Sequence, residues 1–137
     1  MNERLRDERG SAIVEFVFSS TVLLIPLVYL ILAAALVQGG SYAVSGAADA
    51  AAKLFATAGN PAQARARAEQ AVAETMHSHG LPAAQTSISC DGQCLAPGSI
   101  VTVKVSLQVP LPFVSDMVHA SVVTVDAVAS QRVDRFG

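Results

Sequence analysis

An uncharged apolar run from Phe16 to Val37 constrains the fold of this chain more than any other feature. A helix over these residues would rise about 33 Å, enough to cross a hydrocarbon core about 30 Å thick. The alternative is a buried helix of a soluble protein, but such helices keep a polar face and this run has none. The run therefore predicts a transmembrane helix.

The basic residues predict how that helix is oriented. Arg4, Arg6 and Arg9 precede the run, and the first basic residue after it is Lys53. Because Lys and Arg stay on the cytoplasmic side, we expect a cytoplasmic N-terminus and an extracytoplasmic C-terminal part. A secreted enzyme released by cleavage after Ala33–Ala35 is an alternative, although a secretory apolar stretch usually spans only about 7–15 residues.

A lone carboxylate stands at the mouth of the run. Residues 10–16 read G-S-A-I-V-E-F, which places Glu15 directly before Phe16. Charges at the edge of a membrane span are costly and are functional by default, although a carboxylate that merely reaches back to the interface is the simpler alternative. Gly10 offers close access to its backbone, because it has no side chain.

This stretch resembles a class III signal, which a prepilin peptidase cuts ahead of the apolar run. With the Glu15-Phe16 pair, it is similar to the TadE-like family, minor pseudopilins of the Tad/Flp tight-adherence pilus. The resemblance implies cleavage between Gly10 and Ser11. It divides the chain into a leader (1–10), a transmembrane helix (11–38) and an extracytoplasmic pilin-like domain (39–137).

The resemblance also implies partners and a location. The expected partners are the prepilin peptidase, the Flp pilin, a second pseudopilin, the inner-membrane assembly platform and membrane lipid. The protein would be a single-pass protein of the inner or plasma membrane and a candidate for incorporation into the pilus, without a cofactor. We expect Glu15 to pair with the Ser11 α-amine of a neighbouring subunit; removing one partner of a buried pair costs about 3–5 kcal/mol.

An alanine-rich stretch after the span predicts a helix that continues outward from Tyr42 to Ala58 and ends near Gly59. Gly39 and Gly40 are expected to loosen it. Packing on the chain's own domain and packing on another subunit are equally compatible with this spacing. The expected packing face consists of Ala43, Ala47, Ala50, Ala51 and Leu54.

A second helix is predicted to begin at Asn60-Pro61, because Asn suits the N-cap and Pro the first helical position. Gln63 resembles the third residue of a capping box. We expect the helix to run to about Ser78, before Gly80 and Pro82. Its apolar stripe consists of Ala64, Ala68, Val72 and Met76.

Alternating apolar residues predict strands over 100–109 and 121–130, with a shorter strand over 86–89. The expected fold class is α+β: the long N-terminal helix, a second helix and a small antiparallel sheet with one face in water. The connection over 110–118 is unusually apolar, at Leu111, Phe113, Val114 and Met117. We expect it to tuck over the core; a partner or membrane contact is the alternative.

Cys90 and Cys94 enclose the turn-forming triplet D-G-Q, and outside the membrane we expect them to form a disulfide. A metal site with His77 and His79 is less favoured, because the spacing matches no structural zinc motif. His119 stands alone and is expected to be structural.

Charge and motifs limit the function classes. Charged residues make up 15% of the 137 residues and the net charge is −2, so nucleic-acid binding has no electrostatic support. No catalytic motif such as G-x-S-x-G or H-E-x-x-H occurs, so we do not expect an enzyme. The alternative to a pilin-like subunit is an uncleaved, signal-anchored binding module outside the cell.

Overall fold

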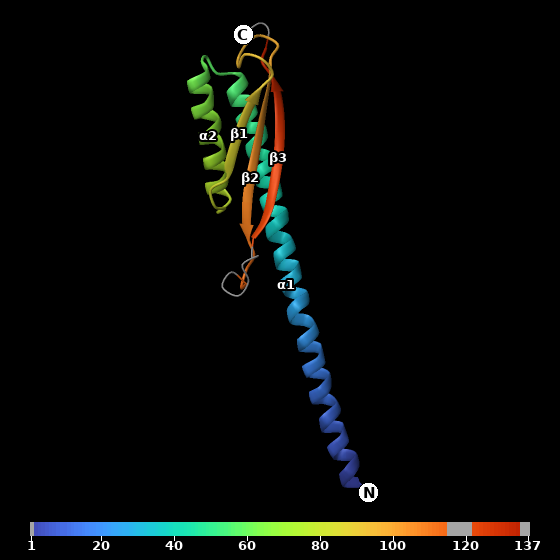
Figure 1. Cartoon of the computed structure of the whole chain (residues 1–137). Coiled ribbons are helices and arrows are strands. Elements are labelled where there is room, and N and C mark those ends of the chain that lie inside the picture. The colour runs from blue at the N-terminus through green and yellow to red at the C-terminus, as the bar shows by residue number, and fades with distance from the viewer. Residues whose placement is uncertain (1, 115–121, 135–137) are drawn as a thin grey trace. The chain divides into compact units, whose positions relative to one another are not determined.

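The computed structural model describes the backbone of residues 2–114 and 122–134, and the side chains in these ranges from residue 10 onward. Two helices, α1 (Asn2–Ala56) and α2 (Pro61–Ser78), precede three strands. The strands are β1 (Gln85–Cys90), β2 (Ile100–Pro110) and β3 (Val122–Arg132) (Figure 1). They form an antiparallel sheet in the order β1-β2-β3, which confirms the predicted α+β class.

The chain divides into two compact units, Met1–Ala35 and Leu36–Gly137. The first is the N-terminal part of α1. The second contains the rest of α1, together with α2 and the sheet. Helix α1 belongs to both units, and its residues 36–56 are the part that packs within the second.

The sheet alternates as its sequence predicts. β2 is the central strand; Val103 pairs with Ile88 of β1 on one side and with Ala129 of β3 on the other. Because side chains alternate between faces, one register places the large apolar residues from Val101 to Val109 on the inner face, while Ile100 at the start of β2 is half-buried. These fully buried side chains are Val101, Val103, Val105, Leu107 and Val109.

The packing face of α1 is built from small residues and lies on the chain's own sheet and second helix. Ala43, Ala47 and Ala51 are buried as predicted, but Leu54 is 40% exposed and Ala50 is only half-buried. The predicted face was rotated around the helix axis: the true face also includes residues at adjacent positions, and Phe55 lies at its C-terminal end. The missed members are Val44, Ala48, Ala52 and Phe55.

Gly40 marks the closest approach of α1 to the sheet. A Cβ atom added there would lie 2.6 Å from Cγ2 of Val109, whereas one added at Gly39 would meet nothing within 4 Å. Helix α1 continues through both glycines and ends at Ala56. At Gly40 the missing side chain provides the space that Val109 fills.

Helix α2 begins and ends as predicted. The side chain of Asn60 accepts a hydrogen bond of 2.8 Å from the backbone N–H of Gln63, which satisfies one free donor of the first turn. At the other end, Leu81 N–H donates to the Met76 carbonyl and Gly80 N–H to that of His77. Gly80 takes the positive φ of 64° that this C-terminal motif requires. The buried stripe is the predicted one: Ala64, Ala68, Val72 and Met76.

The outer face of the sheet carries polar pairs. Thr102 and Ser130 hydroxyls lie 2.9 Å apart across β2 and β3. Asp126 accepts a hydrogen bond from Ser106 and forms an ion pair of 3.7 Å with Lys104. These pairs support the register from the solvent side, as cross-strand pairs do.

The connection after β2 does not follow the favoured prediction. Phe113 is 85% exposed, so its ring is not tucked over the core. Leu111 and Val114 are half-buried. Met117, Asp116 and His119 lie outside the described residues, as does the predicted strand start at Ser121.

Candidate functional site

The predicted processing motif lies on an exposed surface of α1. Gly10, Ser11, Glu15 and Phe16 are all exposed, with Phe16 at 72%. Since α1 runs from Asn2, the Gly10–Ser11 peptide is helical, and a protease would have to unwind it locally. Glycine favours this, because Gly in a helix interior is less stable than Ala by about 1 kcal/mol.

Glu15 has no cation one turn away on its helix. Ala12 and Ser11 occupy the positions three and four residues before it, and Phe18 and Ser19 those after it. Among the residues whose side chains are described, no salt bridge includes Glu15. Cleavage after Gly10 would change the surroundings of Glu15, because it would create a cationic α-amine at Ser11, four residues before the Glu15 carboxylate.

Large apolar side chains cover the helix that follows. From Ile13 to Leu36 they are 42–74% exposed, on every side of the helix. The described residues contain one helix long and apolar enough to cross a membrane, and that helix is α1. Such a surface is unstable in water, since no polar face is available to it. It is compatible with a single-pass membrane anchor.

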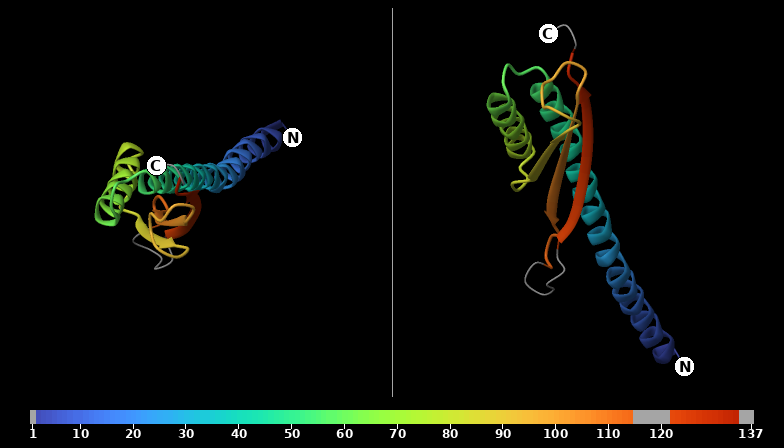
Figure 2. Two further views of the ribbon diagram at one scale, coloured as in Figure 1. Left: turned by 90° about the horizontal axis from the view of Figure 1, so that it is seen from above. Right: turned by 45° about the horizontal axis from the view of Figure 1, so that its top comes forward.

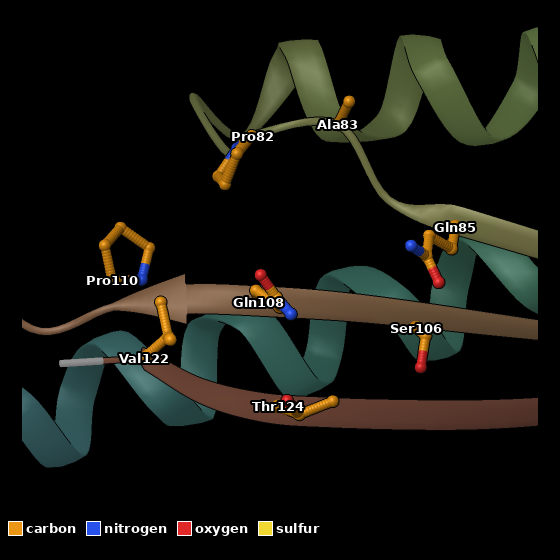
Figure 3. Close-up of a pocket in the computed structure, with 8 residues that line it drawn as sticks. All are labelled: Pro82, Ala83, Gln85, Ser106, Gln108, Pro110, Val122 and Thr124. Atoms are coloured by element: carbon orange, nitrogen blue, oxygen red, sulfur yellow. The ribbon is translucent and has the colours of Figure 1, made fainter. Parts of the chain in front are cut away.

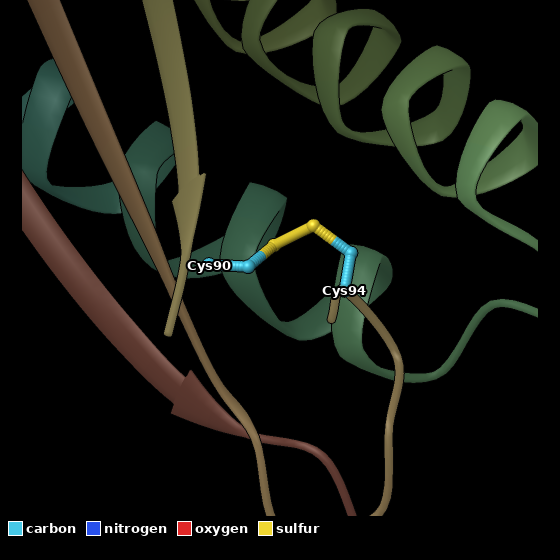
Figure 4. Close-up of a disulfide and its surroundings, with 2 residues drawn as sticks. All are labelled: Cys90 and Cys94. Carbon is cyan, nitrogen blue, oxygen red and sulfur yellow. A yellow bond between two sulfur atoms is a disulfide. The ribbon is translucent and has the colours of Figure 1, made fainter. Parts of the chain in front are cut away.

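The second unit carries a disulfide between Cys90 at the end of β1 and Cys94 (Figure 4). Their Cα atoms are 5.4 Å apart. The enclosed turn places Gly92 at a positive φ of 86°, and Asp91 N–H donates to the Ile100 carbonyl where β2 starts. The bond closes the turn that leads from β1 towards β2.

A cavity of about 350 Å³ lies on the outer face of the sheet (Figure 3). Its wall is formed by Gln85 of β1, Ser106 and Gln108 of β2, and Thr124 of β3, with Pro82 at the rim. None of the lining side chains titrates near neutral pH. The cavity can offer hydroxyl and amide hydrogen bonds to a ligand.

A second cavity, of about 450 Å³, lies between α2 and β1. Glu69 and His77 stand at its edge, and Val72 and Met76 line it. Glu69 lies 4.0 Å from Arg65 in an exposed pair. Within residues 10–114 and 122–134, no cluster of three or more His, Cys, Asp or Glu side chains is arranged to hold a metal ion.

The sequence-predicted residues therefore fall into two separate places. Gly10, Ser11, Glu15 and Phe16 share one short stretch of α1, and the cysteines close a turn in the second unit. The sequence did not identify Gly40 as a packing position. Its spacing of seven residues before the buried Ala47 could have placed it on the same face of the helix. Comparison of the chain with family models, curated proteins and solved structures finds no match.

Proposed function

We propose that this protein is a membrane-anchored, pilin-like structural subunit, a minor pseudopilin that helps to assemble a Tad/Flp-type adhesion pilus. The observation that carries the proposal is the exposed Gly10-to-Phe16 motif on α1, directly ahead of an apolar helical surface. The same helix continues into an α+β domain and packs there through small side chains. This order of parts suits a subunit that is inserted first and assembled laterally.

The proposed mechanism depends on one carboxylate. Prepilin peptidase cuts between Gly10 and Ser11, and the new α-amine carries a positive charge at neutral pH. In the apolar surroundings of packed spans, Glu15 of one subunit pairs with the Ser11 amine of the next. Neutralising both charges makes one axial register between subunits more favourable than others, since an unpaired buried charge is strongly destabilising.

N-terminal sequencing of the protein purified from membranes tests the processing step. We expect the mature chain to begin at Ser11. A chain that begins at Met1, or after Ala35, would contradict the proposal.

Substitution of Glu15 tests the pairing step. Glu15→Ala should leave cleavage intact and abolish incorporation into pili, whereas Glu15→Asp, which keeps the charge, should restore part of it. Ser19→Ala, one turn further along the helix, is the matched control and should assemble normally. Normal piliation in Glu15→Ala would rule out the pairing.

An uncleaved, signal-anchored binding module is the second candidate. The polar cavity on the outer sheet face favours it, because its hydroxyl and amide groups are open to a neutral ligand. This candidate predicts a mature chain that begins at Met1 and Glu15→Ala with unchanged behaviour, so the two experiments above separate it from the pseudopilin.

A further inference from the structure

We propose that the apolar turn after β2, residues 110–114, inserts into the interfacial layer of the same membrane that anchors α1. This turn is called the membrane-contacting turn below. The inference rests on one part of the proposed function, namely that the apolar part of α1 spans a membrane. It is independent of cleavage at Gly10 and of pilus assembly.

The turn presents the apolar ring of Phe113 to its surroundings. Phe113 is 85% exposed, and residues 109–114 carry no charge. The backbone φ of Phe113 is 66°, in the left-handed region that a residue with a bulky side chain rarely adopts. Strained positions of this kind persist mostly where function requires them, so the outward position of this ring calls for an apolar partner.

The backbone of the turn is also suited to a poorly hydrated environment. Pro110 and Pro112 have no N–H group, so two donors that would otherwise need a hydrogen-bond partner are missing. A backbone group left without a partner in lipid costs several kcal/mol, and loops that enter the interface must limit such groups. Prolines at both positions reduce that cost.

Packing within the second unit brings the end of β2 beside the residues of α1 that directly follow the apolar run. Gly40 touches Val109, the penultimate residue of β2. Gly40 follows the end of the apolar run at Val37 by about 4.5 Å of helix. Headgroup layers extend about 5–8 Å beyond the hydrocarbon on each side, so the end of β2 lies within that layer.

The direction of β2 carries the turn further inward. β2 runs towards the earlier residues of the α1 segment in its unit, and its last residues lie beside Gly40 (Figures 1 and 2). From Val109 to Phe113 the chain can extend by up to about 13 Å. Phe113 is therefore within reach of the boundary between headgroups and acyl chains, where aromatic rings are enriched in membrane proteins. Lipid is favoured over a protein partner because the apolar run ends at this same level.

The absence of tryptophan from the chain allows a direct measurement. The full-length Phe113→Trp variant is reconstituted into phosphatidylcholine and phosphatidylglycerol vesicles, with and without brominated phosphatidylcholine. The matched control is Val128→Trp, because Val128 is 62% exposed on the outer sheet face. Val128 pairs with Lys104, which places it about 20 Å along the strand from Pro110. Flotation of the vesicles shows that each variant is anchored.

We expect brominated lipid to lower the Phe113→Trp emission about two-fold and to leave Val128→Trp unchanged, since bromine quenches only at contact within the bilayer. Aqueous acrylamide should quench the two variants in the opposite order. If the vesicles float with the chain but Phe113→Trp is not quenched by bromine, the proposal is overturned while the anchor stands. A blue-shifted emission that neither reagent quenches would assign the turn to a protein partner instead. A chain that does not float with the vesicles would overturn both the anchor and this proposal.

Discussion

The two parts of α1 share one helical backbone but differ in which side chains they expose and which they bury. From Ile13 to Leu36 the helix exposes large side chains on every side, whereas from Gly40 to Phe55 it buries small ones on a single face. The large side chains find no partner within their own unit, so they require a surrounding solvent that is itself apolar. The small side chains bring the helix axis close to the sheet. Side-chain size along one helix thus separates an exposed apolar surface, compatible with a membrane anchor, from a surface that packs on the chain's own sheet.

Substituting the largest buried residue of α1 should give the largest effect. Phe55→Ala is expected to lower the free energy of unfolding of the second unit by about 3–5 kcal/mol, because it leaves a cavity among fully buried side chains. Chemical denaturation in mild detergent, followed by circular dichroism, measures this. Leu23→Ala is the control: Leu23 is 74% exposed in the first unit and should not change that transition. A similar loss in both variants would end the distinction between the two parts.

An introduced positive charge should affect the apolar part of α1 and leave the part that packs on the sheet unchanged, the reverse of the Phe55→Ala result. Leu27→Arg places a cation near the centre of the apolar run and should make membrane insertion less favourable by about 3 kcal/mol. Residues 40–55 of α1 are called the packing part below. Leu54→Arg, at a 40% exposed position of this part, should leave membrane insertion unchanged. The fraction of each variant that resists alkaline extraction from membranes is the readout. Equal extraction of the two variants would count against a spanning role for residues 16–37.

The adjacent glycines provide a sharper test, because their substitutions should have opposite signs. Gly40→Ala places a methyl group against Val109 and should destabilise the second unit by about 1–3 kcal/mol. Gly39→Ala meets open space and should stabilise the helix by up to about 1 kcal/mol. Thermal unfolding in detergent distinguishes the two. Stabilisation by both substitutions would mean that the helix does not approach the sheet at Gly40.

The smallest effect is expected on the solvent side of the packing part. Lys53 and Asp49 are 2.7 Å apart and more than half exposed, one helical turn from each other. Lys53→Ala should cost only about 0.3–0.5 kcal/mol, and 0.5 M salt should remove most of that difference. Denaturation at low and high salt measures it. A loss above about 1 kcal/mol would indicate that this side of α1 is also buried in a contact.

Most of the fold was predictable from local patterns, and the errors on the packing face of α1 have one origin. The stripe of α2 was correct in every residue, and so was the alternation of β2 from Val101 to Val109. In β2 the period is revealed by polar residues such as Thr102 and Lys104 between the valines. Along the packing part of α1, alanine occurs on all sides, so sequence did not distinguish Ala51 from Ala50. Leu54 was chosen as an apolar residue, but the rotation of α1 against the sheet is set by Gly40 and Phe55.

The candidate processing stretch was visible in the sequence as a pattern, while its surroundings were not. Gly10 and Glu15 stood out because a glycine and a carboxylate are unusual ahead of an apolar run. The exposure of Phe113 was not predictable, because an apolar residue between prolines is equally common over a core and at an interface. Only the contact of Val109 with Gly40 places that turn.

The contact between Gly40 and Val109 also bears on the order in which the protein matures. Synthesis proceeds from the N-terminus, so the packing face of α1 leaves the ribosome well before β2, its partner, exists. During that interval the face consists largely of methyl groups, which expose little area for unwanted association. The strands need no such delay, because each pairs with the next along the chain and such local pairings form fast. Alanine rather than leucine on this face therefore lowers the tendency of α1 to associate wrongly before the sheet has formed.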